Sequence, residues 1–311
     1  MNIRLPLFLA LLLSAVTCLA DDLHREEGFK LVNGVDHFYR IVGDGEPFVV
    51  LHGGPGMYHD ELYPFFDEFA ASRRVIFYDQ RGNGLSQLAT VDSTTFTVEL
   101  LVEDLEQLRR AFGIEQLNIT GHSWGGLLAM YYAVEHPENV KRLILVSSAP
   151  VNTELLIKCY ERQIGMYTPE QWAHLQKLWE SDAYRAGDPA VHNEALRLAE
   201  GVLFHDPAKV DPWMAAAAFD AAKAANAVRL EDLGRGMKLG IHVQDRLDRI
   251  TCPTLIVHCR DDFIVPEAPQ LAHELIAGSQ MVVLENSGHY PHVEIPGPFF
   301  AAVERFIAET R

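Results

Sequence analysis

A serine flanked by glycines, in the segment Gly-His-Ser-Trp-Gly at residues 121–125, is the feature that most restricts the fold of this chain. Residues 116–120 alternate like a short strand, and residues 126–133 are apolar and rich in helix formers. A strand that enters a helix through a one-residue turn strains that residue, and a Cβ on either flanking glycine would collide with its neighbours. The turn lifts the Ser123 hydroxyl out of the sheet, beside the first helical amides. The pattern predicts a nucleophile at Ser123, with a tightly packed turn as the alternative.

The amino-terminal residues 1–20 predict a segment that is removed from the folded protein. Arg4 supplies a positive charge, residues 5–16 are almost wholly apolar, and Ala20 precedes two aspartates. This is the layout of a secretory signal peptide cleaved after Ala20, so we expect an exported protein, periplasmic or secreted. The apolar run is shorter than the ~18–20 residues that span a bilayer, which makes a membrane anchor the weaker alternative. A lipid anchor on Cys18 is weaker still, because the preceding residues lack the usual pattern.

Charge and cysteine content exclude several classes of function. The 311 residues carry a formal net charge of −17. Proteins that bind nucleic acids or anionic membranes carry the opposite balance, so we expect neither partner. No Cys-x-x-Cys motif or His/Cys cluster has the spacing of a zinc site, so no metal is expected. The length suits one large α/β domain with an insertion, or two modest domains.

Strand-like and helix-like segments alternate along most of the chain. Residues 29–32 and 37–42 predict a hairpin around Asn33-Gly34. Further strands are expected at residues 48–51, 74–78, 116–120, 142–146, 254–257 and 281–284. Helices are expected near residues 60–70, 101–112, 126–133, 267–277 and 298–308. Repeated β–α units with short connections predict a mostly parallel sheet with helices on both faces.

The alternation stops near Pro150 and resumes after Gly240. The residues between them contain no convincing strand, and prolines divide them into helix-like pieces. This segment follows the strand after the Ser123 helix, so we expect it to cover the active-site end of the sheet as an all-helical cap. The expected divisions are the signal peptide, the first half of the α/β core, the cap and the second half of the core, at residues 1–20, 21–150, 151–240 and 241–311.

A serine hydroxyl is a poor nucleophile unless an adjacent base, itself oriented by a carboxylate, takes its proton. His289 follows the strand that ends at residue 284, so it projects at the sheet edge where an α/β fold binds ligands. It is the predicted base, and His292 is the competitor. Asp261 and Asp262 follow the strand near residue 258, and either can supply the carboxylate.

The loop His-Gly-Gly-Pro-Gly at residues 52–56 follows another predicted strand. Gly53 and Gly54 let the backbone approach a substrate carbonyl, and Pro55 stiffens the loop. We expect the loop to supply an oxyanion donor and to contact substrate through Gly53 and Pro55. A plain glycine-rich turn is the alternative.

These segments together resemble a known family. The motifs at residues 52–56, 121–126 and 78–86, the last reading Tyr-Asp-Gln-Arg-Gly-Asn-Gly-Leu-Ser, are similar to those of the proline iminopeptidases, which have the α/β-hydrolase fold. The segments Asp262-x-x-x-Pro266 and Ser-Gly-His ending at His289 also match. The order Ser, Asp, His is the usual one in this fold. The resemblance covers both halves of the expected core.

The resemblance implies roles for several residues. Ser123, Asp262 and His289 correspond to the catalytic triad, with Asp262 rather than Asp261 as the acid, and the amides of Trp124 and Gly54 correspond to the oxyanion hole. No cofactor is implied.

The resemblance also implies an aminopeptidase that releases an amino-terminal residue, such as proline, from short peptides. Iminopeptidases bind the substrate's free amine with acidic side chains of the cap and, in some members, with one directly after the triad aspartate. Here that position is Phe263, and the thirteen acidic residues of the cap form no motif that matches. An esterase or lactonase acting on small apolar acyl substrates is therefore the alternative. A binding protein that keeps the fold without the chemistry is a further one.

Overall fold

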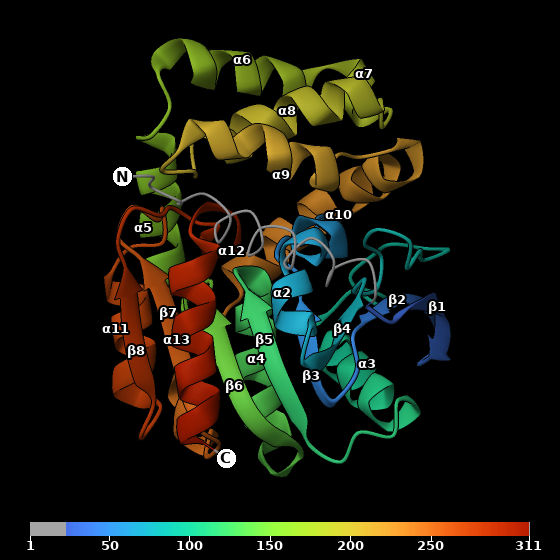
Figure 1. Ribbon diagram of the computed structural model, residues 1–311. Coiled ribbons are helices and arrows are strands. Elements are labelled where there is room, and N and C mark those ends of the chain that lie inside the picture. Colours follow the sequence, from blue (N-terminus) through green and yellow to red (C-terminus); the bar gives the residue numbers. More distant parts are fainter. Residues whose placement is uncertain (1–22, 311) are drawn as a thin grey trace, which may run out of the picture.

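The computed structural model describes residues 23–310, without the side chains of residues 231–239, so the expected signal peptide lies outside the described residues. Within this part of the chain, eight strands form one sheet in the order β1-β2-β4-β3-β5-β6-β7-β8 (Figure 1). Strand β2 pairs antiparallel with β1 and β4, whereas the remaining pairs are parallel. The strands are β1 Arg25–Val32, β2 Val35–Val42, β3 Glu46–Leu51, β4 Arg73–Tyr78, β5 Leu117–His122, β6 Val140–Val146, β7 Thr254–Cys259 and β8 Gln280–Leu284. The predicted parallel sheet and its amino-terminal hairpin are confirmed.

The helices that pack on the sheet are α2 Asp67–Ala70, α3 Val98–Ala111, α4 Trp124–Glu135, α11 Glu267–Leu275, α12 Pro291–Glu294 and α13 Pro296–Glu309. The predicted helix over residues 60–70 is wrong in its extent. The chain instead forms two 3₁₀ turns, His59–Glu61 and Tyr63–Phe65, followed by the short helix α2. Pro64 lies inside the second turn, where it removes a backbone donor that a continuous helix would need.

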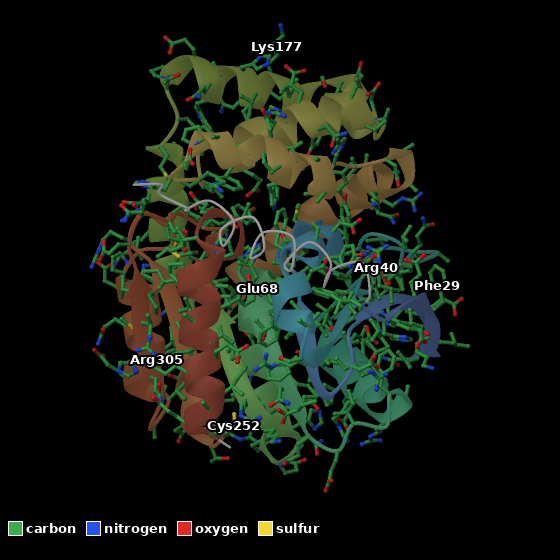
Figure 2. The ribbon with its side chains drawn as sticks, viewed as in Figure 1. Phe29, Arg40, Glu68, Lys177, Cys252 and Arg305 are labelled. Atoms are coloured by element: carbon green, nitrogen blue, oxygen red, sulfur yellow. The ribbon has the colours of Figure 1, made fainter. Side chains whose placement is uncertain are left out.

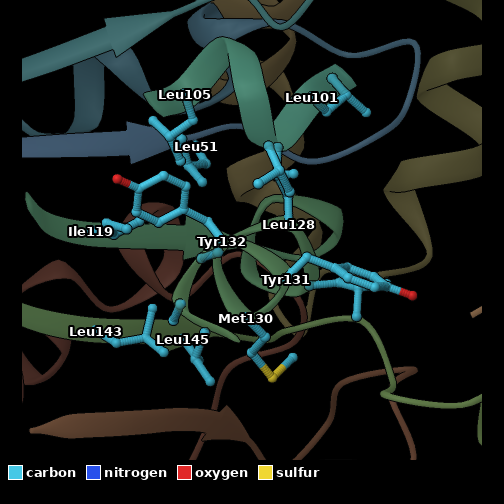
Figure 3. Close-up of a cluster of buried hydrophobic side chains, with 14 of the residues drawn as sticks. Leu51, Leu101, Leu105, Ile119, Leu128, Met130, Tyr131, Tyr132, Leu143 and Leu145 are labelled. Carbon is cyan, nitrogen blue, oxygen red and sulfur yellow. The ribbon is translucent and has the colours of Figure 1, made fainter. Parts of the chain in front are cut away.

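Alternate residues of the strands face two separate cores, as the pleat of a sheet requires. Val49 and Leu51 of β3 lie in the core under α3 and α4, whereas Phe48 and Val50 face a second core under α2 and α13. Figure 3 shows the first core, in which leucines of α3 and the apolar face of α4 meet side chains of β3, β5 and β6. Helix α4 is buried along nearly its whole length, so the serine that precedes it has a rigid support.

Between β6 and β7 the described chain forms helices and no strand. These cap helices are α5 Thr153–Ile164, α6 Pro169–Glu180, α7 Asp182–Arg185, α8 Pro189–Gly201, α9 Val210–Ala217 and α10 Ala221–Leu239. Figure 1 shows α6, α8 and α9 stacked in layers above the sheet. Figure 2 shows Lys177 of α6 pointing outward from the top of this stack. No helix in residues 23–310 is long and apolar enough to cross a membrane.

Candidate active site

Ser123 lies between β5 and α4 with φ 53° and ψ −120°, a strained conformation for a residue with a side chain. The turn is held in place because the Ser123 amide donates to the Val146 carbonyl at 3.0 Å. A Cβ on Gly121 would meet the backbone of Gly125, and a Cβ on Gly125 would meet the Leu51 carbonyl. The structure thus has the strained turn, and the close approach at both glycines, that the sequence predicts.

His289 and Asp262 meet at the carboxyl ends of β7 and β8. The His289 Nδ1 lies 2.9 Å from Asp262 Oδ1, and both side chains are buried. Burial alone would raise the pKa of Asp262, but the charge of His289 and its hydrogen bond hold that pKa below the usual value. An ionised carboxylate accepts only, so His289 Nδ1 carries a proton and points it at Asp262.

The alternative residues for these two positions take part in other contacts. Asp261 pairs with His205 of the cap at 2.9 Å, and both side chains are half exposed. His292 is buried with its Nε2 3.4 Å from the Glu61 carbonyl. Burial lowers the pKa of His292 well below its usual value, so this ring is neutral. Asp262 and His289 thus contact each other, whereas Asp261 and His292 have other partners.

A cavity of about 520 Å³ brings the predicted residues together. Ser123, His289, Gly53, Gly54 and Pro55 all line it. A Cβ on Gly53 would come within 3.3 Å of the Ser123 Cβ, so the glycine loop reaches the serine directly.

Trp124, which follows the serine, is not among the residues that line this cavity. Its side chain is buried, and its indole Nε1 donates to Gln80 Oε1 at 3.0 Å. Its main-chain amide is the first of helix α4, where an α-helix provides no acceptor of its own.

A buried acid that the sequence analysis missed connects the glycine loop to the serine turn. Glu61 Oε1 accepts hydrogen bonds from the Gly53 amide and, at 3.4 Å, from His122 Nδ1. The other ring nitrogen of His122 donates to the His289 carbonyl at 3.0 Å. Burial would lower the pKa of His122, but the hydrogen bond and the charge of Glu61 raise it overall. Glu61 and His122 are therefore a buried ion pair that bonds to the Gly53 amide at one end and to the His289 carbonyl at the other.

The cap completes the cavity with aromatic side chains and one acid. Its aromatic lining residues are Tyr160, Tyr167, Trp172, Trp179, Tyr184 and Phe219. Glu200 of α8 lines the same cavity, where the Tyr290 hydroxyl donates to its Oε2 at 2.6 Å. Among the described side chains, Glu61 and Glu200 are the acids of the lining, and no lysine or arginine contributes to it. The lining is thus apolar and aromatic with negative charge.

The cap is also bonded to the loop that carries His289. The His289 amide donates to the Leu203 carbonyl at 2.8 Å, and Tyr290 stacks on Phe204 at 4.7 Å. Glu294 accepts from the Asp206 amide at 2.9 Å and from the Gly288 amide at 2.7 Å. The segment of the cap just after Glu200 therefore fixes the position of the His289 loop.

Comparisons with known proteins agree with this fold. A family model described as the alpha/beta hydrolase fold matches residues 46–296. The proline iminopeptidase of Lactobacillus acidophilus is 30% identical over 294 residues, which are 90% of this chain and 97% of that protein. That of Clostridioides difficile is 32% identical over 281 residues, 86% of this chain and 93% of that protein. The crystal structure of VinJ superposes with a TM-score of 0.70 at 25% identity, over 92% of this chain and 99% of that one.

The chain belongs to the alpha/beta hydrolase family. It is a proline iminopeptidase-like member, as the motifs predicted. Two residues of this hydrolase's cavity were not predicted. Glu200 was one of many acids in the cap, and no spacing distinguished it. Glu61 lies eight residues after Gly53, in a segment whose expected helix did not predict a buried acid. Within residues 23–310, no cluster of three His, Cys, Asp or Glu side chains could hold a metal ion.

Proposed function

We propose that this protein is a serine aminopeptidase that releases an amino-terminal residue, proline in particular, from short peptides. Ser123 is the nucleophile, His289 the base and Asp262 the carboxylate that orients it. The main-chain amides of Gly54 and Trp124 bind the oxyanion. The proposal is supported by the position of Ser123, Gly54 and His289 on one cavity, by the contact of Asp262 with His289, and by the similarity to proline iminopeptidases over most of the chain.

The reaction follows from the proton positions. His289 Nε2 takes the proton of Ser123 as Oγ attacks the scissile carbonyl, and the imidazolium that forms is stabilised by Asp262. The tetrahedral intermediate collapses when His289 returns that proton to the leaving nitrogen, and the C–N bond breaks. Water then attacks the acyl-enzyme with His289 as base again, which releases the amino acid and restores Ser123. The chemistry of this sequence of steps requires no cofactor.

The observation that carries the substrate assignment is the carboxylate of Glu200 on the cavity that Ser123 lines. Glu200 reaches this cavity from the cap, whereas Glu61 belongs to the core, where it accepts from Gly53 and His122. A free amino terminus is cationic at neutral pH, and burying it without a partner is costly. We infer that Glu200 binds the substrate's ammonium group, while Tyr290 holds the carboxylate in place. The aromatic rings around it suit an apolar side chain such as the pyrrolidine of proline.

The first test compares substrates on the purified mature protein. We expect turnover of prolyl 4-nitroanilide, weaker turnover of its N-acetyl derivative, and no activity in the Ser123→Ala variant. The esterase alternative has one observation in its favour: Phe263, next to the triad aspartate, stands edge-on to the His289 ring with centroids 4.7 Å apart, where an acidic side chain would otherwise contact the amine. Hydrolysis of 4-nitrophenyl butyrate without any aminoacyl arylamide turnover would refute the aminopeptidase proposal and favour the esterase.

The second test addresses Glu200 directly. Glu200→Gln keeps an oxygen that can accept from Tyr290 but removes the charge. A hydrogen bond to a charged group is worth about 1.5–3 kcal/mol, so kcat/KM for prolyl 4-nitroanilide should fall about 10- to 100-fold. Glu194→Gln is the matched control because Glu194 lies on the same helix, half exposed, and pairs with His174. Equal kinetics for the two variants, or an equal loss on substrates without an amine, would contradict the role of Glu200.

We also propose that the protein is exported, to the periplasm or the medium, after cleavage following Ala20. The proposal rests on the charge, length and small residues of the amino-terminal segment. Amino-terminal sequencing of protein recovered from the periplasm or medium should begin at Asp21. A full-length chain retained in the cytoplasm would contradict export.

A further inference from the structure

The Asp-Gln-Arg segment at residues 79–81 carries no role in the function proposed above, yet its glutamine touches both sides of the oxyanion site. Gln80 is fully buried. Its main-chain amide donates to His52 Nε2 at 3.1 Å, and its side-chain amide donates to the His52 carbonyl at 2.8 Å. Its side-chain oxygen accepts from Trp124 Nε1 at 3.0 Å. The two hydrogen bonds of the Gln80 side chain therefore join the glycine loop, at His52, to Trp124, whose main-chain amide is a proposed oxyanion donor.

His52 carries this contact to the glycine loop. Because its Nε2 accepts from Gln80, its Nδ1 bears the proton, and that atom lies 2.8 Å from the Gly53 carbonyl oxygen. Burial lowers the pKa of His52, which keeps the ring in this neutral form. The Gly53 carbonyl and the Gly54 amide belong to one trans peptide plane and point in opposite directions. A bond that fixes the carbonyl therefore fixes the direction of the Gly54 N–H.

Trp124 carries the contact to the other donor. Its indole is buried, and its main-chain amide is the first of helix α4, directly after Ser123. The bond from Nε1 to Gln80 restrains the side chain, and through it the residue whose amide faces the oxyanion. The Gly53 amide cannot act as an oxyanion donor instead of the Gly54 amide, because the Gly53 amide donates to Glu61.

We propose that Gln80 is a positioning residue that sets the spacing between the Gly54 and Trp124 amides, and so the geometry of the oxyanion hole. The inference rests on the proposed function, because it assumes an oxyanion at Ser123. Preorganised donors act mainly on the transition state, where charge develops on the oxygen. Loss of Gln80 should therefore lower kcat and leave ground-state binding nearly unchanged.

The experiment replaces Gln80 by methionine, which has a similar shape and neither hydrogen-bonding group. We expect kcat to fall about 10- to 100-fold on the better of prolyl 4-nitroanilide and 4-nitrophenyl butyrate, with KM changed by less than about threefold. The affinity for phenylboronic acid, whose serine adduct places an oxygen in the oxyanion site, should fall by a similar factor. Trp124→Phe removes one of the three bonds and should lower kcat by a smaller factor, about threefold to tenfold. If Gln80→Met does not fold, the kcat of Trp124→Phe tests the positioning role of Gln80 instead.

Asn118→Leu is the matched control for a structural effect. Asn118 is a buried amide that donates to the Pro47 carbonyl and accepts from Arg142, both at 2.9 Å, near the amino end of β5 and away from the serine. This variant should lose thermal stability while kcat and boronate affinity stay within about twofold of wild type. An active wild type with kcat and boronate affinity unchanged in Gln80→Met would overturn this inference alone. A wild type that hydrolyses neither substrate would overturn the proposed function and this inference with it.

Discussion

The ion pair of Glu61 and His122 gives the sharpest prediction for stability. His122 Nε2 lies 3.0 Å from the His289 carbonyl, which can only accept, so Nε2 carries a proton. Its Nδ1 faces the Glu61 carboxylate, which also only accepts. Both ring nitrogens therefore carry protons, and the ring is an imidazolium. This agrees with the raised pKa of His122 and with the lowered pKa of Glu61, whose burial is outweighed by the hydrogen bond from His122.

Glu61→Gln separates the charge from the shape. The Glu61 oxygen that accepts from Gly53 is the same one that faces His122, so a glutamine oxygen there can keep the Gly53 bond. This glutamine oxygen then faces His122 Nδ1 in one of two states. The ring is either an imidazolium that has lost its counterion, or a neutral ring whose Nδ1 lone pair repels the oxygen. Breaking a buried ion pair costs about 3–5 kcal/mol, and His122 can reduce this by losing its proton. We expect Glu61→Gln to lower the free energy of unfolding by about 2–3 kcal/mol near pH 6.

The pH dependence tests the cause. A histidine whose folded pKa is raised contributes stability that is complete below its unfolded pKa, about 6.5, and is lost as pH rises through the folded pKa. Glu61→Gln lacks this contribution, so the stability difference from wild type should shrink from about pH 6.5 upward. Urea unfolding at several pH values measures it, with Glu304→Gln, at a partly exposed pair with Arg73, as a control expected to change by less than about 1 kcal/mol. A difference that is constant from pH 6 to 10, or below about 0.5 kcal/mol throughout, would refute the imidazolium assignment.

Two further predictions follow from the same surroundings. Burial would lower the pKa of His59, but the nearby charge of Asp79 raises it to about 9, so wild type should lose up to about 3 kcal/mol of stability between pH 6.5 and 9. In His59→Gln the free energy of unfolding, measured in urea at several pH values, should fall less steeply between pH 6.5 and 9. An unchanged slope would contradict the raised pKa of His59. Gly125→Ala should destabilise the protein by at least about 3 kcal/mol, because its Cβ would meet the Leu51 and His52 carbonyls. A melting temperature within a degree or two of wild type would contradict the close approach at this glycine.

Much of the fold could be predicted because strand and helix patterns are local. The short continuous apolar run at residues 48–51, for example, is a buried strand of the parallel part of the sheet. The hairpin at Asn33-Gly34 follows from turn chemistry, since both residues have positive φ. The expected helix over residues 60–70 is interrupted at Pro64, which lacks the backbone donor that a continuous helix needs. The order of the strands in the sheet needs contacts that no local pattern contains.

The residues of the candidate site likewise differ in whether a local pattern could predict them. The resemblance to the iminopeptidases selected Asp262 over Asp261. Ser123, His289 and this aspartate pair could be assigned to the candidate site because each follows a strand, and the carboxyl ends of parallel strands meet at one edge. Glu61 and Glu200 could not, because each reaches the cavity through packing between segments far apart in sequence. The same holds for His122, because the His289 carbonyl to which it donates is 167 residues away.

The contacts between cap and core imply that substrate recognition and base placement are not independent here. The proposed amine-binding residue, Glu200, accepts from Tyr290, which directly follows the proposed base, His289. Three residues after Glu200, the Leu203 carbonyl accepts from the His289 amide. Movement of the cap around Glu200 and Leu203 would therefore shift the imidazole as well as the carboxylate. A variant in which the cap is replaced in order to change the substrate class must keep the Leu203 contact with His289. A displacement of the base by about 1 Å can lower the rate about 100-fold. The core determines how a carbonyl is attacked, and the cap, through these two bonds, helps to determine whether the base is in position to do so.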